Sequence, residues 1–162
     1  MQLDHIHISI AAQQLTGFQA GKVVCCYPVS SALNGLGERS GSGCTPRGEH
    51  RVRARIGAGQ PLGSVYIGRR PTGEVWTPEL AAANPQRDWI LTRILWLCGN
   101  RPGFNRGGQV DSQRRYIYLH GTGDDQPMCE PLSHGCIRLR NEDMLELFDS
   151  TPVGCTVQID AA

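Results

Sequence analysis

Residues 115–121 read Arg-Tyr-Ile-Tyr-Leu-His-Gly. Aromatic and β-branched side chains dominate this stretch and a glycine ends it, which predicts a strand over residues 115–119 that ends at His120-Gly121. A side chain at the end of a strand is held firmly by the sheet and yet faces a loop. We therefore expect His120 to lie at the edge of a β-rich scaffold.

Further strands are predicted on both sides of this one. Ile6, Ile8 and Ile10 alternate with polar residues, which indicates a half-buried strand. The apolar run at residues 23–27 predicts a central strand, and the β-branched content of residues 88–98 favours a strand over a short helix. Other runs predict strands at residues 13–18, 22–28, 50–56, 66–67, 74–76 and 155–159.

Only one clear helix is predicted. Asn141 is a good N-cap, two acidic residues follow it, and an apolar stripe runs through residues 144–148. Pro71-Thr72-Gly73 predicts a turn, and the glycine- and serine-rich residues 30–48 predict a long surface loop. With no repeat and no interior linker, residues 1–162 are expected to form a single, mainly β domain with one short helix.

The composition argues against several classes of protein. Sixteen basic and fifteen acidic residues leave a net charge of +1, which gives no electrostatic case for binding nucleic acid or an anionic membrane. No apolar run approaches the roughly 20 residues that span a bilayer. The first residues lack the pattern of a secretory signal, so we expect a cytoplasmic protein, or a periplasmic one if an export signal was removed.

The seven cysteines lie at positions 25, 26, 44, 98, 129, 136 and 155. Their number is odd and no CxxC pair occurs, which argues against a structural zinc site. A chain of this length can bury its own core, so a disulfide framework is not expected either. We expect most of these cysteines to be reduced and buried as small apolar residues.

One thiol has chemically suitable neighbours. Cys136 lies in the stretch Ser-His-Gly-Cys-Ile-Arg at residues 133–138, and twelve residues separate His120 from that stretch. A free thiol has a pKa of about 8.5 and needs a base or a positive charge nearby to act as a nucleophile at neutral pH. His120 can approach Cys136 across a returning connection, and Gly135 lets successive N–H groups converge on an oxyanion. Arg138 is suited to binding a carboxylate in a bidentate manner.

Two other interpretations of these residues stay open at this point. A cysteine beside a histidine is more often a buried pair than a catalyst. Zinc binding by His120, Cys129, His134 and Cys136 is the weaker alternative, because zinc sites usually show close pairs of ligands.

The stretch His120-Gly121, followed by Ser133-His134-Gly135-Cys136, resembles the signature of the L,D-transpeptidase (YkuD) family. That signature is a His, a spacer, and a Ser/Thr-His-Gly-Cys motif. Residues 27–30, 45–48, 94–97 and 141–143 resemble further landmarks of the family in the usual order. The resemblance covers nearly the whole chain and implies a β-sandwich-like fold with a short helix after the catalytic cysteine.

The resemblance implies acyl transfer on peptidoglycan stem peptides. Cys136 would attack the carbonyl of the L-centre of a diamino acid, ahead of a terminal D-residue. His120 would accept the thiol proton and later give it to the leaving amine. The carbonyl of Gly121 would orient His120, a role that a carboxylate fills in other enzymes. No metal and no organic cofactor is required.

The resemblance also implies roles for the residues around the thiol. The oxyanion hole is expected from the backbone amides of His134, Gly135 and Cys136. The expected substrate-binding residues are Tyr118, Ser133 and Arg138, with Ser133 also bracing the turn. The expected partners are stem peptides or soluble muropeptides and carbapenem-type inhibitors, and the protein is expected to be a monomer.

The fate of the resulting thioester separates the candidate functions. We favour hydrolysis, which makes the protein an L,D-carboxypeptidase of tetrapeptide muropeptides, because the twelve-residue spacer leaves little chain for a second cleft that would hold an amine. The alternatives are an L,D-transpeptidase that forms cross-links or exchanges D-amino acids, a stem-peptide-binding module without turnover, and a papain-like protease. The joint presence of His120 and Cys136 argues against the binding module, and the β-rich pattern argues against the papain-like protease.

One departure from the family pattern concerns packing. His50 follows Thr45-Pro46-Arg47-Gly48, where the family more often has Phe or Tyr. The packing beneath the active-site loop is therefore expected to differ.

Overall fold

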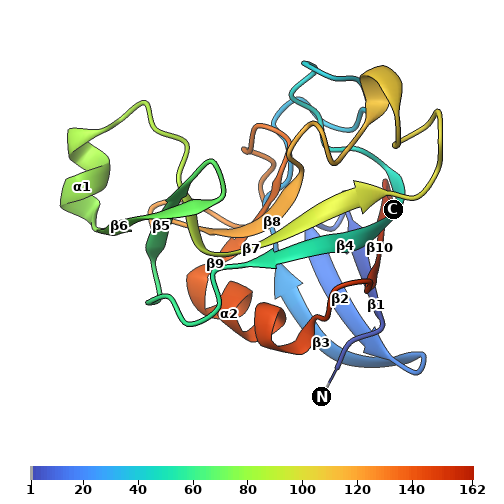
Figure 1. Ribbon diagram of the computed structural model, residues 1–162, viewed down its shortest axis with the longest axis horizontal. Coiled ribbons are helices and arrows are strands. Elements are labelled where there is room, and N and C mark those ends of the chain that lie inside the picture. The colour runs from blue at the N-terminus through green and yellow to red at the C-terminus, as the bar shows by residue number, and fades with distance from the viewer. Residues whose placement is uncertain (1) are drawn as a thin grey trace.

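A curled mixed sheet organises the computed structural model, which describes residues 2–162 (Figure 1). Its strands follow the order β3-β2-β1-β10-β4-β7-β5-β6, and β8 and β9 continue from β7. The strands are β1 (His5–Ser9), β2 (Gln14–Gln19), β3 (Lys22–Pro28), β4 (Gly48–Ile56), β5 (Ser64–Ile67), β6 (Arg70–Val75), β7 (Ile90–Gly99), β8 (Tyr118–Thr122), β9 (Ile137–Arg140) and β10 (Thr156–Asp160). The prediction of a mainly β fold is confirmed.

The core lies between the curled sheet and helix α2 (Asn141–Ser150). Ile6 and Ile8 of β1 are fully buried, as are Val157 and Ile159 of the neighbouring parallel strand β10. Burying each such side chain stabilises the fold by about 1.5–3 kcal/mol before the entropy cost. The apolar face of α2 completes this core with Met144, Leu147 and Phe148.

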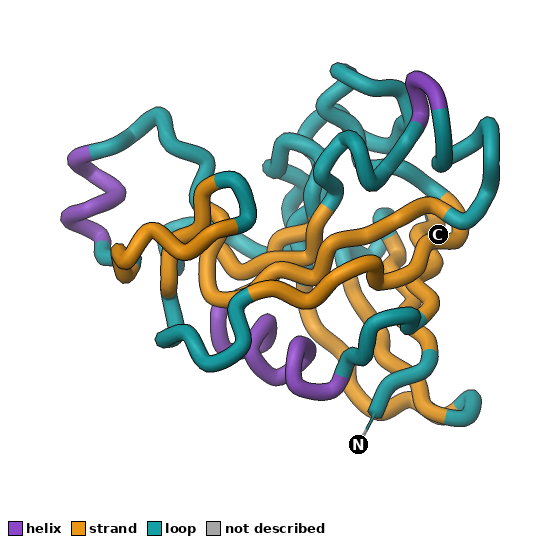
Figure 2. Tube along the Cα trace, viewed as in Figure 1, coloured by secondary structure: helices purple, strands orange, loops and turns teal. Residues whose placement is uncertain are grey.

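Three long connections gather at one end of the sheet (Figure 2). Ser30 pairs with Arg138, and Ala32 pairs with Ser133, so the connection after β3 lies against the segment before β9. The N–H of Ser40 donates to the carbonyl of Gln109 at 2.6 Å, which joins the first connection to the one before β8. Because Ser30 and Ala32 are buried, residues 30–48 are not wholly the surface loop that their composition predicts.

The hairpin β5–β6 and helix α1 (Pro78–Ala83) project from the other side of the sheet (Figure 1). The hairpin turns at Gly68-Arg69, and Pro71-Thr72-Gly73 lie inside β6 instead of forming the predicted turn. The sequence analysis missed α1. Its start has a recognisable signal, because the hydroxyl of Thr77 accepts from the N–H of Leu80 and Pro78 occupies the first turn.

Three further predictions need correction. β8 begins at Tyr118 and contains His120, because Tyr116 has a φ of 56° and ends the extended backbone before it. β3 is an edge strand and not a central one, with the side chain of Val23 exposed. Asn141 is the first residue of α2 and not its N-cap, and its Oδ1 accepts from the hydroxyl of Thr92 at 2.6 Å.

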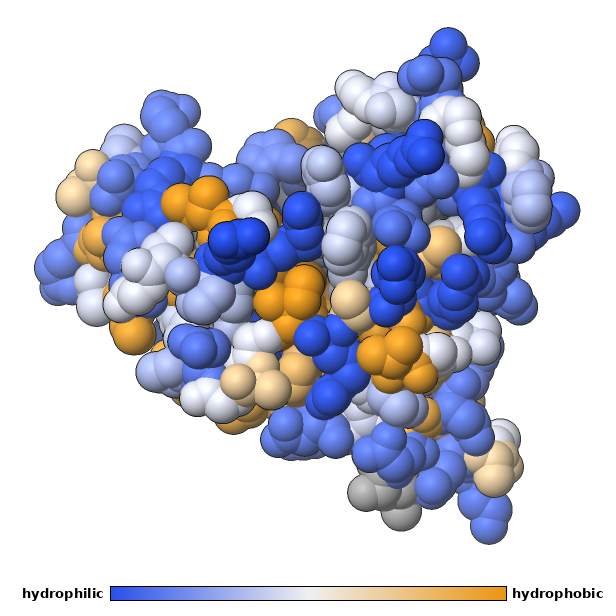
Figure 3. Space-filling view, viewed as in Figure 1, coloured by the Kyte–Doolittle hydropathy of each residue, from blue (hydrophilic) through white to orange (hydrophobic). Residues whose placement is uncertain are grey.

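All seven cysteines are free, but the prediction that most are buried is wrong. Cys98 and Cys155 are buried, whereas Cys26 and Cys129 are exposed. On the face shown in Figure 3, hydrophilic residues predominate and the hydrophobic ones form small separate groups. Within residues 2–162, no helix combines the length and the apolar character needed to cross a membrane.

Candidate active site

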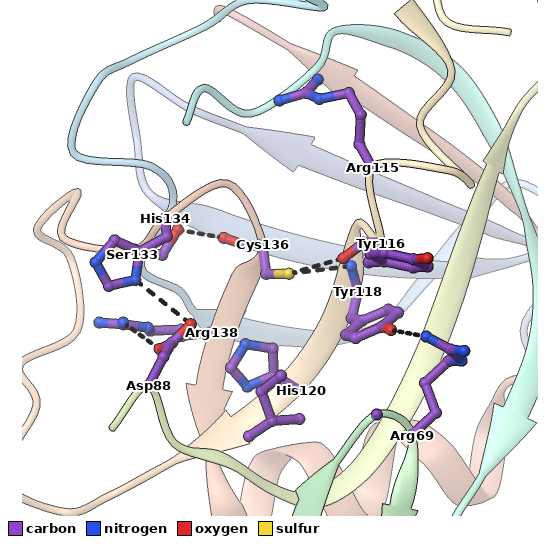
Figure 4. Close-up of a pocket in the computed structure, with 12 residues that line it drawn as sticks. Arg69, Asp88, Arg115, Tyr116, Tyr118, His120, Ser133, His134, Cys136 and Arg138 are labelled. Carbon is purple, nitrogen blue, oxygen red and sulfur yellow. Dashed lines mark hydrogen bonds and ion pairs between the residues drawn. The ribbon is translucent and has the colours of Figure 1, made fainter. Parts of the chain in front are cut away.

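A cavity of about 540 Å³, called here the thiol cavity, opens where β8, the segment before β9 and the β5–β6 turn meet (Figure 4). Strand pairing explains why its residues converge. β8 and β9 are parallel, with His120 opposite Arg138, and Cys136 directly precedes β9. His120 and Arg138 are paired and so lie on the same face of the sheet. Cys136 is two residues before Arg138 and shares that face, so His120 and Cys136 both face the cavity. The predicted side chains that line it are Tyr118, His120, Ser133, His134, Cys136 and Arg138.

The thiol of Cys136 is held by the backbone just before and at the start of β8. Its S–H donates to the carbonyl of Tyr116 at 3.3 Å, and the N–H of Tyr118 donates to Sγ at 3.3 Å. Burial raises the pKa of Cys136 to about 12, although the hydrogen bond from Tyr118 opposes that shift. The sequence analysis expected its neighbours to lower this pKa. The thiol is instead neutral at rest and needs a base at the moment of attack.

The imidazole of His120 has the properties of such a base. Burial lowers the pKa of His120, and the side chain is 1% exposed, so the ring is neutral. Its Nδ1 donates to the carbonyl of Gly121 at 2.6 Å, which is the contact that the sequence analysis anticipated. With the proton on Nδ1, Nε2 carries a lone pair and can accept a proton.

Hydrogen bonds inside the Ser133–Cys136 turn fix its shape. Ser133 Oγ donates to the carbonyl of Cys136 and accepts from the N–H of Gly135. The hydroxyl of Thr45 donates to the carbonyl of Gly135 at 2.9 Å. Gly135 has a φ of 135°, where a side chain would be strained. The amide of Gly135 is thus engaged, which leaves those of His134 and Cys136 as candidates for an oxyanion hole.

Arg138 is bonded to protein groups and 7% exposed. Nη2 donates to Asp88 Oδ1 at 3.0 Å, and Nη1 donates to Gln126 Oε1 and to the carbonyl of Leu132. Burial acts to raise the pKa of Asp88, but the attraction of His120 when it is protonated at low pH, together with Arg138 and His134, outweighs burial and holds that pKa below its ordinary value. Asp88 also lies 3.4 Å from His134 Nδ1. The guanidinium predicted to bind substrate therefore forms an internal ion pair.

The sequence analysis missed three charged residues that line the cavity: Arg69, Asp88 and Arg115. Asp88 is the first residue of the segment 88–98 that predicts a strand and lies two residues before β7, and Arg69 lies in a hairpin turn. No local motif marks either of them, because their partners lie about 50 residues away along the chain.

His50 lies in β4, outside the thiol cavity, and is fully buried. Its Nδ1 donates to the carbonyl of Gly48 at 3.0 Å, and its Nε2 accepts from the hydroxyl of Ser112 at 2.8 Å. Burial lowers the pKa of His50 to about 4. This polar packing occupies the position where the sequence analysis noted a departure from the usual aromatic residue.

Residues 2–162 hold no group of three or more His, Cys, Asp or Glu side chains arranged to bind a metal ion. Within the described part of the chain, a neutral thiol and a neutral imidazole whose Nε2 has no hydrogen-bond partner line one cavity, next to several arginines and a turn in which the amides of His134 and Cys136 are unengaged. This arrangement suits nucleophilic attack on a carbonyl assisted by a general base.

Comparison with known proteins agrees with this chemistry. A probable L,D-transpeptidase of Salmonella typhimurium, ErfK/SrfK, is 34% identical over 95 residues, which are 57% of this chain and 30% of that protein. The matched stretch thus spans about a third of the relative.

Solved structures share the fold. An L,D-transpeptidase from Xylanimonas cellulosilytica (residues 123–326) has a TM-score of 0.62 at 20% identity, and the match covers 98% of this chain and 61% of that one. L,D-transpeptidase 3 from Mycobacterium tuberculosis, in complex with a faropenem-derived adduct, has a TM-score of 0.57 at 16% identity, covering 96% and 59%. The family model of the L,D-transpeptidase catalytic domain matches residues 3–159, and the chain therefore belongs to this family, YkuD.

Proposed function

We propose that the protein is a cysteine acyl-transfer enzyme that removes the terminal D-amino acid from peptidoglycan tetrapeptide stems. The observation that carries this proposal is the neutral thiol of Cys136 in one cavity with His120, whose Nδ1 is committed to the carbonyl of Gly121. Family membership supports the same substrate class.

The first half-reaction forms a thioester. His120 Nε2 takes the proton of Cys136 as Sγ attacks the carbonyl of the L-centre, and the carbon–sulfur bond forms. The amides of His134 and Cys136 stabilise the oxyanion. The carbon–nitrogen bond then breaks, and His120 gives its proton to the departing amine of the D-residue. Because both groups begin neutral, the thiol is deprotonated only as it attacks.

The second half-reaction decides which enzyme this is. Hydrolysis is our first candidate, since His120 Nε2 can deprotonate a water and then protonate the leaving thiolate. The product would be a tripeptide stem, as expected of an L,D-carboxypeptidase. Water needs no binding cleft of its own.

Transfer to an amine is the second candidate, because one observation favours it. A cavity of about 750 Å³, here the tryptophan cavity, lies between α1, Trp76 and Trp89. A smaller one of about 250 Å³ shares Asp88 and Arg138 with the thiol cavity and Trp89 with the tryptophan cavity. The spacer before the Ser133–Cys136 turn is short, but the unpredicted α1 supplies a wall of the tryptophan cavity, which is a candidate site for the amine.

A β-lactam probe tests the nucleophile. Incubation with a carbapenem should acylate Cys136 alone, because acylation requires the base and the oxyanion contacts. Iodoacetamide should instead react first with the exposed Cys26 and Cys129, since burial raises the pKa of Cys136. Cys136→Ala should lose both the adduct and the release of D-alanine, with Cys129→Ala as the matched control. A carbapenem adduct on Cys129 would contradict the proposal.

A product ratio tests the fate of the thioester. Purified tetrapeptide muropeptide is incubated with the enzyme and an added D-amino acid, and the products are separated. Tripeptide as the main product supports the carboxypeptidase. Mostly exchanged or cross-linked product would replace it with the transpeptidase.

A further inference from the structure

We infer that Arg69 is the carboxylate-recognition residue of the thiol cavity, which binds the terminal carboxylate of the D-residue that leaves the substrate. This inference rests on the proposed function, since it concerns the part of the substrate just beyond the scissile bond. It assigns substrate specificity to the turn of the β5–β6 hairpin, about 50 residues before the signature motif.

The thiol cavity carries an excess of positive charge. Three arginines line it, Arg69, Arg115 and Arg138, and Asp88 is the one carboxylate among its lining residues, all within the described part of the chain. Burial lowers the pKa of His120 and raises that of Cys136, so neither group changes this balance at neutral pH. A cleft lined by one sign of charge attracts ligands of the other sign. The field thus favours a substrate end that carries a carboxylate.

Two of the three arginines are already engaged by the protein. Arg138 forms its ion pair with Asp88 at 3.0 Å. Arg115 donates to the carbonyls of Cys44 at 2.6 Å and Gly37 at 3.3 Å, and it is within 3.4 Å of the hydroxyl of Ser42. Arg115 therefore holds the connection after β3 in place, with few donors left for a ligand.

Arg69 has most of its donors free. Nη1 donates to the hydroxyl of Tyr118 at 3.1 Å, and no carboxylate lies within ion-pair distance of Arg69 among residues 2–162. The guanidinium stacks 4.7 Å from the ring centre of Trp96 and 4.9 Å from that of Tyr116. Aromatic stacking fixes the plane of the guanidinium without using its N–H groups. A planar fork of this kind matches the two oxygens of a carboxylate.

The contacts of Arg69 also relate it to the reacting atom. Arg69 bonds or stacks with Tyr116 and Tyr118, whose backbone groups are the two that contact Cys136 Sγ. Figure 4 shows the thiol and the guanidinium on opposite sides of this tyrosine pair. The terminal carboxylate of the substrate lies one residue beyond the carbonyl that Sγ attacks. A carbonyl at the thiol thus directs that carboxylate along the tyrosines towards Arg69.

The backbone at Arg69 supplies an independent observation. Its φ is 64°, in the left-handed region, within a turn where Gly68 also has a positive φ of 57°. Such turns favour glycine or asparagine at both central positions, because a larger side chain is strained there. An arginine at this position needs compensation, which the stacking and the Tyr118 hydrogen bond supply. Strain retained at a residue that faces a cavity is a pointer to function.

The inference is tested with two substrates that differ only at the terminal group. One tetrapeptide has the free carboxylate and the other the corresponding amide, and the released D-residue is measured. This release accompanies acylation, so the assay works for a hydrolase and for a transpeptidase. Arg69→Gln should lower kcat/KM for the carboxylate substrate by about 10- to 100-fold and leave the amide substrate nearly unchanged. For the carboxylate substrate, the kcat/KM of Arg69→Lys should lie between those of wild type and Arg69→Gln, because lysine keeps the charge and lacks the planar fork of donors.

The controls separate recognition from a structural role. Arg70→Gln changes the neighbouring exposed residue of the hairpin and should leave the ratio of the two substrates unchanged. An equal loss on both substrates in Arg69→Gln would overturn the inference, because Arg69 would then only brace the tyrosines. Loss of the carboxylate preference in Arg115→Gln but not in Arg69→Gln would also overturn it.

A binding measurement keeps the inference testable if the proposed function fails. Cys136→Ala protein is titrated calorimetrically with the same two peptides, with and without Arg69→Gln. We expect tighter binding of the carboxylate peptide, by about tenfold, and loss of that preference in the double variant. If wild-type enzyme releases no D-residue but this preference is present, the proposed function fails and the inference stands. Equal affinity for both peptides overturns the inference.

Discussion

Two buried histidines in this molecule make the same kind of hydrogen bond through Nδ1 and differ at Nε2. His50 in β4 and His120 in β8 each donate Nδ1–H to a backbone carbonyl, and burial lowers the pKa of both. The Nε2 of His50 accepts from the hydroxyl of Ser112. The Nε2 of His120 has no protein hydrogen-bond partner among residues 2–162, and the ring faces the thiol cavity. A neutral, oriented imidazole is thus common to a packing site and to the candidate catalytic site.

The difference shows what makes a buried histidine reactive. Orientation through Nδ1 and a lowered pKa prepare the ring, but only an unpaired Nε2 beside a substrate cavity can accept a proton in a reaction. At His50 the same nitrogen is used to satisfy a buried polar group, which stabilises the fold. Substitution of His120 should therefore lower turnover, whereas substitution of His50 should lower the free energy of unfolding.

The largest expected effect is on turnover in His120→Ala. Removing the general base should lower kcat by about 10²- to 10⁴-fold, measured as release of D-alanine from a tetrapeptide stem. His50→Ala is the matched control, and its turnover per folded molecule should stay within about threefold of wild type, because His50 lies outside the thiol cavity. A comparable loss of turnover in both variants would remove the distinction between the two sites.

The next effect is a pH dependence of stability that originates at His50. Its folded pKa of about 4 lies below the ordinary 6.5, so between those values the unfolded chain binds more protons than the folded one. Stability contributed by neutral His50 is present above pH 6.5 and is lost as the pH falls towards 4, by roughly 3 kcal/mol in all. Urea unfolding at several pH values should show a steeper loss for wild type than for His50→Phe. Parallel curves for the two proteins would contradict this assignment.

A smaller effect is expected from Ser112→Ala. The substitution removes the hydroxyl that donates to His50 Nε2 and leaves a buried acceptor unpaired, which should lower the free energy of unfolding by about 1–3 kcal/mol. Denaturant unfolding at pH 7 measures this. Thr45→Ser is the control, because it changes another buried residue and keeps the hydroxyl that donates to Gly135; its free energy of unfolding should change less than that of Ser112→Ala. An unchanged midpoint in Ser112→Ala would show that the bond contributes nothing.

The smallest effect is expected from His134→Ala. The side chain of His134 is 75% exposed, and its 3.4 Å contact with Asp88 lies at the surface, so only its backbone amide is expected to serve the reaction. Turnover should fall less than about tenfold, far less than in His120→Ala. If His134→Ala were the less active of the two, the general base would have to be reassigned to His134.

The sequence predicts best where a local pattern and a buried position coincide. The alternating isoleucines of β1 and the apolar stripe of α2 are recognisable because one face of each element is buried in the core. The pair His120 and Cys136 is recognisable because the motif around it resembles the YkuD signature; residue types alone left a buried pair as the more common interpretation. The contact of His120 with the carbonyl of Gly121 is implied by the same resemblance, and the structure contains it.

What the sequence does not reveal depends on contacts between distant segments. β3 has an apolar composition but lies at the edge, since the sheet order is set by β10 inserting beside β1. Arg138 has the right type to bind a substrate, yet Asp88, 50 residues earlier in the chain, pairs with it. Burial of Cys136 reverses the expected direction of its pKa shift. None of these partners is marked by a local pattern.

The position of β10 has a consequence for how the chain folds. In the sheet, β10 lies between β1 and β4, and β1–β3 join the other strands only through it. Because β10 follows every other described strand in the chain, β1–β3 and the remaining strands should not join into one sheet until residues 156–160 are available. Contacts between strands about 150 residues apart require a large loop to close, which makes folding slow. The exposed edges of β1 and β4 would meanwhile be free to pair with other chains, so translation speed and chaperone access should affect the yield of native protein.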